Sequence, residues 1–155
     1  VIAWSENLTE ARCKEVGAVL VSKEEILRLS DFLTIHLLLS DRTRGIVQAE
    51  DLSLMKPEAF LINTSRGPII DEGALITALE NRNIAGAGLD VFDVEPLPLD
   101  HPLRKLTNTV IIPHLGYVTV ENYHNWFRGT VKNIRSWLDG KLINEMAGRN
   151  PVTPG

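Results

Sequence analysis

This sequence has a single cysteine, a small net charge and no long apolar run. Cys13 is the one cysteine among 155 residues, which excludes an internal disulfide framework and any metal motif built on paired cysteines. The net charge is only -4 and no basic block occurs, so we expect no nucleic-acid partner. No apolar run approaches the roughly 20 residues that span a bilayer, so we expect no membrane partner. The segment from Val1 to Asn7 lacks the pattern of a signal peptide, which makes a cytoplasmic location the expectation.

The apolar content is sufficient for one hydrophobic core. Hydrophobic residues make up 44% of the chain and charged residues 23%, values typical of a globular protein and not of a disordered one. A length of 155 residues corresponds to about one ordinary domain. We predict that residues 1–139 form this domain and that residues 140–155, with their prolines and glycines, form a loose tail.

Short apolar segments alternate with amphipathic ones along the chain. Phe32 to Leu39 is nearly continuous apolar sequence, which predicts a strand that is buried on both faces. Ser22 and Glu25 have the spacing of a capping box, and Thr119 is predicted to cap the last and longest helix. Further strands are predicted at Val1 to Trp4, Ala18 to Val21, Ala59 to Asn63, Ile84 to Leu89 and Thr109 to Ile112, and further helices at about Thr9 to Val16, Ala49 to Met55 and Asp71 to Leu79.

This alternation of strands and helices predicts an α/β fold, an open and doubly wound parallel sheet with helices on both faces. In such sheets a ligand binds outside the carboxyl ends of the strands. The residues that directly follow each predicted strand are therefore the first candidates for a functional site.

Arg66 follows the strand that ends at Asn63, in a tight loop that also contains Gly67. A guanidinium held there can bind a carboxylate through two parallel hydrogen bonds, a geometry that lysine cannot reproduce. The alternative is a surface arginine that pairs with Asp71 or Glu72.

His114 follows the last predicted strand, and Glu95 lies in the loop after the strand before it. A carboxylate beside a histidine stabilises the imidazolium and fixes its orientation, which suits a general acid/base. Each residue taken alone is more easily explained as structural. Together with Arg66 they project from one edge of the predicted sheet, which favours a substrate with a carboxylate next to a carbonyl or hydroxyl group.

Other polar patterns carry less information. His36 at a strand end could contact a cofactor or be satisfied within the fold, and His101 and His124 are predicted to be structural. No histidine spacing matches a metal-ligand motif, so no metal site is predicted. Gly86 and Gly88 lack the third glycine of a dinucleotide-binding turn and lie within a strand, where they would allow close packing.

Three segments carry a resemblance to a known family, and they occur in consistent order and spacing. They are Asn63 to Pro68, Gly88 to Pro98 and Pro113 to Gly116. Over nearly its whole length the chain resembles the D-isomer-specific 2-hydroxyacid dehydrogenases. The resemblance implies a Rossmann-like dinucleotide-binding domain, of which residues 1–139 are a part, and hydride transfer between NAD(H) and a small 2-hydroxy or 2-oxo acid.

The resemblance also implies roles for individual residues. Arg66 matches the anchor for the substrate carboxylate, His114 the acid/base, and Glu95 the partner of that histidine. Asp90 matches the residue that hydrogen-bonds the nicotinamide carboxamide. The other cofactor-binding positions implied are Ser5, His36, Thr64 and Gly116.

Two departures from the family pattern affect the expected cofactor site. The family's Gly-x-Gly-x-x-Gly turn and its strand would lie before Val1, and that strand would sit centrally, between the strands at Val1 to Trp4 and Phe32 to Leu39. We therefore expect a sheet that is incomplete at its N-terminus, with an uncovered seam in the core, and we interpret the chain as a fragment. Ser5 stands where the family commonly has an acidic residue, so NAD is expected and NADP is not excluded.

Two other interpretations remain open at this point. The chain could be a non-enzymatic, NAD(H)-responsive interaction module, as in the related C-terminal-binding corepressors, or an inactive fragment of a dehydrogenase. The family resemblance also allows a homodimer.

Overall fold

The computed structural model describes residues 1–144. Val1–Gly116 forms one compact unit and Tyr117–Gly155 a second, and each is described by itself. Most of the tail predicted at residues 140–155 lies outside the described residues. The assignment of residues 1–139 to one domain stays a prediction.

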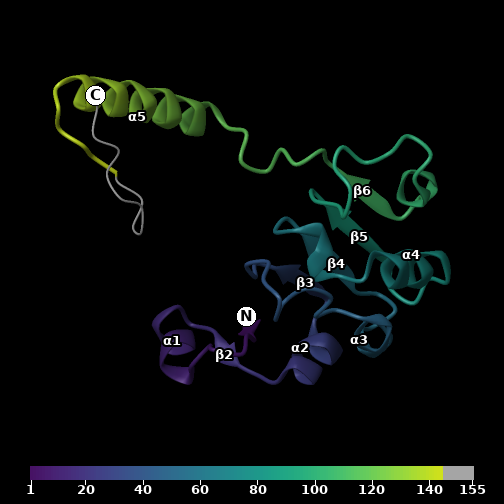
Figure 1. Ribbon diagram of the computed structural model, residues 1–155. Helices are drawn as coiled ribbons and strands as arrows, with labels where there is room; N and C mark the ends of the chain where they lie inside the picture. Colours follow the sequence, from purple (N-terminus) through teal and green to yellow (C-terminus); the bar gives the residue numbers. More distant parts are fainter. Residues whose placement is uncertain (145–155) are drawn as a thin grey trace. The chain divides into compact units, whose positions relative to one another are not determined.

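The first unit is built on parallel strands, as predicted (Figure 1). Its main sheet has the strand order β3 (Phe32–Ile35), β4 (Phe60–Asn63), β5 (Gly86–Leu89) and β6 (Thr109–Ile111). A separate parallel pair consists of β1 (Ile2–Ala3) and β2 (Val19–Leu20). Because neighbouring strands run in the same direction, their carboxyl ends meet at one edge of the main sheet.

Helices alternate with these strands. α1 (Glu10–Glu15) contacts β2 of the separate pair, whereas α2 (Lys23–Leu29), α3 (Ala49–Leu54) and α4 (Glu72–Glu80) cover one face of the main sheet, and α3 contacts both α2 and α4. The predicted capping box begins α2: the Ser22 amide donates to the Glu25 carboxylate at 2.8 Å, and the Glu25 amide donates to the Ser22 hydroxyl at 3.1 Å. These bonds satisfy two backbone donors that a helix start otherwise leaves unpaired.

The core lies between the helices and one face of the sheet. Leu33, Leu61 and Ala87 are register partners on adjacent strands, and all three are buried. Burial of a leucine side chain contributes roughly 1.5–3 kcal/mol. On the opposite face Phe32 is 70% exposed, and its ring stacks on that of Phe60 at 5.6 Å.

The prediction of a strand buried on both faces over Phe32 to Leu39 is therefore wrong for the described residues. The strand ends at Ile35, and its residues alternate between exposed and buried. The physical reason is that the core cluster of the described residues packs against one face of β3 only.

An apolar cavity of about 490 Å³ lies between β1 and β3. Its lining includes Ile2 and Trp4 on one side and Leu33, Ile35 and Leu37 on the other. Within residues 1–144, β1 and β3 belong to different sheets and do not pair. This is the opening expected where the family resemblance places a central strand.

Gly67 begins a short 3₁₀ helix, η1 (Gly67–Ile69), and allows the closest backbone approach near the strand ends. A Cβ atom at this position would lie 2.1 Å from the carbonyl carbon of Phe92. The loop after β4 can therefore lie against the turn after β5 only without a side chain here. Gly86 is also needed for close packing, because a Cβ atom there would lie 2.6 Å from the Asn108 carbonyl oxygen.

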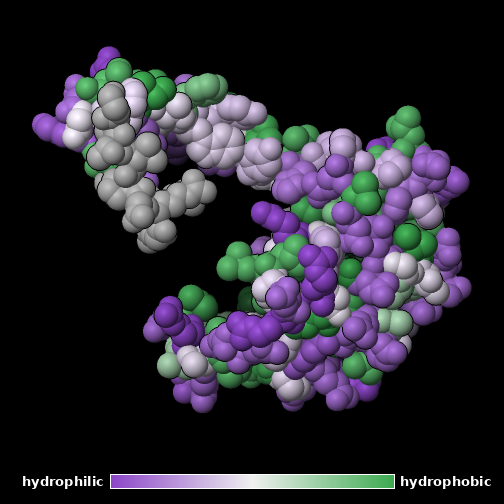
Figure 2. Space-filling view, in the orientation of Figure 1, coloured by the Kyte–Doolittle hydropathy of each residue, from purple (hydrophilic) through white to green (hydrophobic). Residues whose placement is uncertain are grey.

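The second unit contains one long helix, α5 (Val120–Leu138). Thr119 caps it as predicted, since its hydroxyl accepts from the Asn122 amide at 3.2 Å. None of its residues is buried, and Figure 2 shows apolar side chains on its surface. No helix among residues 1–144 has both the length and the apolarity required to cross a membrane.

We predict that Gly67→Ala destabilises the chain by roughly 1–3 kcal/mol or more, because the new methyl group must push the Phe92 backbone away. Urea unfolding of the chain measures this loss. Gly73→Ala, within α4, is the matched control: its nearest neighbour would be the Asp71 carboxylate at 3.4 Å, and helix propensity favours alanine. A Gly67→Ala variant as stable as the Gly73→Ala variant would contradict the close approach.

Candidate active site

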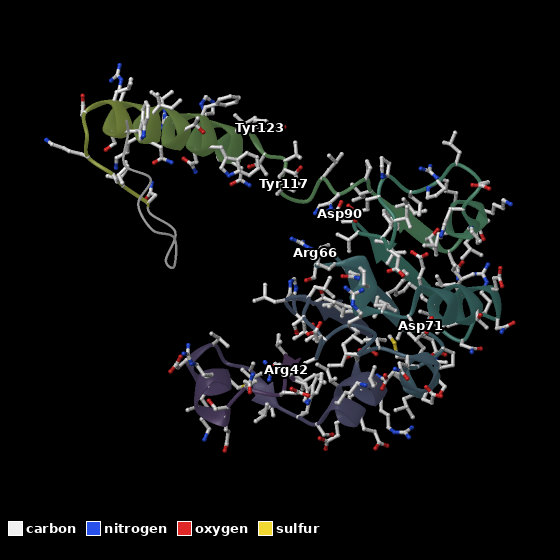
Figure 3. The ribbon with its side chains drawn as sticks, in the orientation of Figure 1. Arg42, Arg66, Asp71, Asp90, Tyr117 and Tyr123 are labelled. Atoms are coloured by element: carbon white, nitrogen blue, oxygen red, sulfur yellow. The ribbon has the colours of Figure 1, made fainter. Side chains whose placement is uncertain are left out.

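The loops after β4, β5 and β6 carry the three predicted catalytic residues. Arg66 follows β4, Glu95 follows β5 and His114 follows β6. Figure 3 labels Arg66 after β4 and Asp90 at the end of β5. The parallel order of these strands places all three loops at the same edge of the sheet.

Glu95 and His114 form a hydrogen-bonded pair. The Oε2 atom of Glu95 lies 2.7 Å from Nδ1 of His114, and the side chains are 33% and 35% exposed. The other Glu95 oxygen accepts from the Phe92 amide at 2.9 Å. With Nδ1 donating to a carboxylate, proton exchange with a substrate falls to Nε2.

The surroundings of Glu95 favour its ionised form. Partial burial alone would raise the pKa of this carboxyl. The hydrogen bonds from His114 and from the Phe92 amide outweigh it, and the charges of His114 and Arg66 add to them, so the pKa lies below its ordinary value. Glu95 is thus a carboxylate at neutral pH, which is the form that stabilises an imidazolium.

The backbone at His114 has an unusual conformation. Its φ angle is +55°, in the left-handed region that residues other than glycine rarely adopt. The amide of His114 donates to the carbonyl of Ile112 at 3.0 Å, which closes a tight turn directly after β6. No signal in the sequence indicated this turn, and backbone strain of this kind often occurs at functional sites.

Asp90 binds the backbone of the two residues that follow His114. It is 4% exposed, and its two carboxylate oxygens accept from the amides of Leu115 at 2.7 Å and Gly116 at 2.8 Å. A Cβ atom at Gly116 would lie 2.9 Å from Asp90 Oδ2. Asp90 and Gly116 therefore fix the loop that carries His114, and their expected contact with a cofactor stays a prediction.

Arg66 is positioned by Asn63, a residue that our sequence analysis did not select. Asn63 is 1% exposed; its Oδ1 accepts from the Ser65 amide at 3.0 Å, and its Nδ2 donates to the Arg66 carbonyl at 2.9 Å. The exposed guanidinium donates to the Ser65 carbonyl at 2.6 Å. The available signal was an amide side chain at the end of an apolar strand, because a buried amide requires partners.

The alternative explanation of Arg66, an ion pair with Asp71 or Glu72, is not seen among the described residues. Asp71 instead caps α4 and accepts from the Ala74 amide at 2.8 Å. Glu72 contacts His101 Nε2 at 3.1 Å, and this pair gives His101 the structural role predicted for it. The positive charge of Arg66 is the smallest of the influences that lower the pKa of Glu95.

The predicted cofactor residues near β1, β3 and β4 lie at the ends of those strands. Ser5 and His36 line the cavity between β1 and β3, and His36 Nε2 lies 3.0 Å from the Thr34 hydroxyl. Thr64 is exposed after β4. The hydroxyl of the next residue, Ser65, donates to the Leu37 carbonyl and so ties the loop after β4 to the segment after β3. Their roles toward a cofactor stay predictions.

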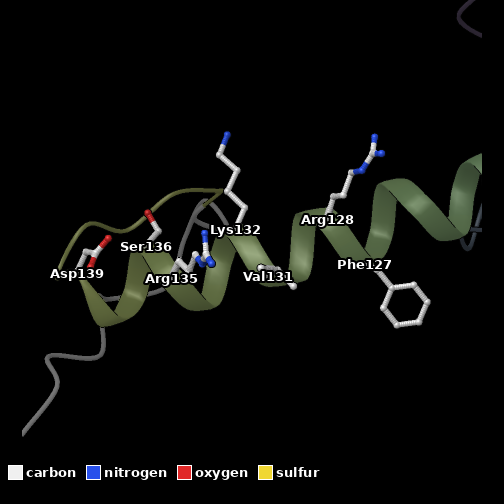
Figure 4. A pocket seen from close by; sticks show the side chains of 7 residues that line it. All are labelled: Phe127, Arg128, Val131, Lys132, Arg135, Ser136 and Asp139. Carbon is white, nitrogen blue, oxygen red and sulfur yellow. The ribbon is translucent and has the colours of Figure 1, made fainter.

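Of two further cavities, one adjoins predicted site residues and the other does not. A cavity of about 320 Å³ adjoins the Glu95–His114 pair and is otherwise lined largely by apolar side chains. A hollow of about 550 Å³ runs along α5 and contains none of the predicted residues (Figure 4). Of these two cavities, only the one in the first unit adjoins predicted catalytic residues.

Comparison with known proteins identifies relatives of this chain. The family described as D-isomer specific 2-hydroxyacid dehydrogenase, NAD binding domain, matches residues 1–116. This match covers the first compact unit. A glyoxylate/hydroxypyruvate reductase B from Enterobacter agglomerans is 47% identical over 119 residues, which are 77% of this chain and 37% of that protein.

Solved structures agree with these relatives. A phosphoglycerate oxidoreductase from Vibrio cholerae superposes with a TM-score of 0.81 at 34% identity, over 90% of this chain and 45% of that one. An NAD-complexed D-isomer specific 2-hydroxyacid dehydrogenase from Lactobacillus delbrueckii has a TM-score of 0.80 at 27% identity, over 94% and 48%. The chain spans about two-fifths of the length of the curated relatives that it matches.

We predict that Glu95→Gln lowers stability at neutral pH and that the loss shrinks in acid. A carboxyl whose folded-state pKa is depressed contributes stability above its ordinary pKa, and this contribution disappears as pH falls through the depressed value. Urea unfolding of both proteins at about pH 7 and about pH 3 measures the two differences. In a His114→Gln background the loss of stability caused by Glu95→Gln at neutral pH should be smaller. If Glu95→Gln alone costs the same stability at both pH values, the hydrogen bond between ionised Glu95 and His114 would be contradicted.

Proposed function

Because this chain belongs to the D-isomer-specific 2-hydroxyacid dehydrogenase family, we propose that it supplies the catalytic residues and most of the cofactor domain of an NAD-dependent enzyme that interconverts small 2-oxo acids and 2-hydroxy acids. The observation that carries this proposal is the Glu95–His114 hydrogen bond of 2.7 Å, at the sheet edge where the loop after β4 carries Arg66. These groups supply an acid/base and an anion anchor at one edge of the sheet.

Arg66 suits the carboxylate of the substrate. Its guanidinium is exposed, and one of its nitrogens already donates to the Ser65 carbonyl, which restricts the orientation of the fork. The remaining N–H groups can bind both oxygens of a carboxylate. In a 2-oxo acid the carbonyl carbon is bonded to the carboxylate carbon, so a substrate anchored in this way has its carbonyl group one bond away from the group that Arg66 binds.

His114 is the proton donor and acceptor of the proposed reaction. In the reducing direction Nε2 donates a proton to the oxygen of the 2-oxo group, which becomes a hydroxyl, and His114 then takes a new proton from water. In the oxidising direction the ring takes the hydroxyl proton, and Glu95 stabilises the imidazolium that forms. When bound, the nicotinamide supplies or accepts the hydride.

The chain offers part of a site for NAD. Thr64 and Asp90 directly follow β4 and β5, and Gly116 is bound by Asp90 in the loop that carries His114, so these residues are proposed as the partners of the nicotinamide ring. Ser5 and His36 share the lining of the cavity between β1 and β3 and suit the ribose end. No Gly-x-Gly-x-x-Gly turn occurs in residues 1–155, so no residue of this chain is assigned to the pyrophosphate. Ser5 carries neither the negative charge that excludes NADP nor a positive charge that would bind it, and NAD is the proposed cofactor.

We predict that His114→Gln, in the full-length protein that contains this chain, lowers kcat for 2-oxo acid reduction by roughly 10²–10⁴-fold, because the glutamine cannot deliver a proton. Loss of NADH absorbance measures turnover, and NADH binding should remain. His124→Gln, at an exposed position of α5, is the matched control and should retain activity. Normal turnover by the His114→Gln variant would remove this residue from the mechanism, and NADH binding without turnover by the wild type would favour the non-enzymatic interaction module.

Arg66→Lys should lower kcat/KM for the 2-oxo acid by roughly 10- to 100-fold, since one charge-assisted hydrogen bond is worth roughly 1.5–3 kcal/mol. The charge remains and the two-pronged geometry is lost. Most of the effect should appear in KM, measured with saturating NADH. Arg28→Lys, whose arginine pairs with Glu24 on the surface of α2, should be neutral. Equal constants for both variants would assign Arg66 a structural role.

A further inference from the structure

Glu72 begins α4 and connects two segments that are distant in the sequence. One of its oxygens lies 3.1 Å from His101 Nε2, and the other accepts from the Asp93 amide at 3.4 Å. The side chains of Glu72 and His101 are 22% and 16% exposed. The carboxylate therefore forms a bridge between the start of a helix and the turn after β5.

The hydrogen bonds of His101 fix which of its ring nitrogens donates. Nδ1 accepts from the Leu103 amide at 3.3 Å and so caps the 3₁₀ helix η2 (Pro102–Lys105). The proton of the neutral ring is then on Nε2, which donates to Glu72. His101 thus ties Glu72 to η2 and leaves the second carboxylate oxygen for the turn at Asp93.

The turn from Phe92 to Glu95 determines where the Glu95 carboxylate lies. The backbone of Phe92 rests on Gly67, and the Phe92 amide donates to Glu95 at 2.9 Å. Glu72 is the third support of this turn, through the Asp93 amide.

The charges around Asp93 are consistent with this arrangement. Burial, together with the negative charges of Glu72 and Asp71, raises the pKa of the Asp93 side chain, and the positive charges of Arg44 and His101 oppose that rise. The Glu72 carboxylate is therefore close enough to the turn to act on it electrostatically as well as through the hydrogen bond.

We propose that Glu72 and His101 are positioning residues, which hold the Phe92–Glu95 turn at the place where Glu95 can hydrogen-bond to His114. Both act through other residues and neither belongs to the set that we assign to substrate or cofactor. The inference rests on the proposed function only for its kinetic consequence, because the effect on the Glu95–His114 hydrogen bond can be observed without turnover.

Glu72→Gln in the full-length protein is the direct test. Glutamine can still accept from His101, but its NH₂ group then faces the Asp93 amide, and this support is lost. We expect kcat to fall by roughly 10–100-fold, as for a small displacement of a catalytic group, while KM for the 2-oxo acid and NADH binding change little.

A spectroscopic measurement separates this inference from the proposed function. The Nδ1–H resonance of His114, observed by ¹H–¹⁵N NMR, should be present in the wild type and broadened or lost in Glu72→Gln. Glu80→Gln, at the other end of the same helix, is the matched control and should change neither signal nor kcat. If Glu72→Gln does not fold, Glu72→Asp, which is too short to reach both partners, takes its place in every measurement.

The outcomes are distinct. An unchanged His114 resonance in Glu72→Gln would overturn the positioning role, whatever the wild type catalyses. Loss of the resonance in a protein that reduces no 2-oxo acid would support the positioning role and contradict the proposed function. Loss of the resonance with lower kcat and unchanged KM would support both.

Discussion

The hydrogen bond between Glu95 and His114 forms because β5 and β6 are parallel neighbours. Their register places Leu89 beside Ile111, so the loops that follow start at the same edge. The two residues then meet across 19 positions of sequence. Asp90 fixes the His114 loop through two backbone amides, and the contact of Gly67 with Phe92 brings the Arg66 loop to the same place. The geometry of the site is thus a consequence of strand order, of one close backbone approach and of the hydrogen bonds that Asp90 accepts.

Much of this arrangement could be predicted from the sequence. The capping box at Ser22, the helix start at Thr119 and the parallel α/β fold depend on local patterns, and the structure confirms them. Arg66, Glu95 and His114 could be selected because each follows a predicted strand. Burial of the strand at Phe32 on both faces could not be judged in this way, since an apolar segment does not reveal what covers it.

The supports of the site could not be predicted. The Glu72–His101 contact joins residues 29 positions apart, and it depends on where α4 and η2 pack, which periodicity does not indicate. The left-handed backbone conformation at His114 could not be predicted, because the residue type that usually indicates such a conformation is glycine. The partners of Asn63 are backbone groups of its own loop, which any sequence would offer. The homodimer and the selectivity for NAD stay predictions.

The central claim is that Arg66, Glu95 and His114 act on one small ligand. The most direct measurement is a titration followed by side-chain NMR. Oxamate, an unreactive analogue of a 2-oxo acid, is added to the full-length protein in the presence of NADH. We predict that the resonances of the Arg66 guanidinium and the His114 imidazole shift together, with one dissociation constant, and that Arg66→Lys weakens the shift of His114. Saturation of one group without any response of the other would contradict it.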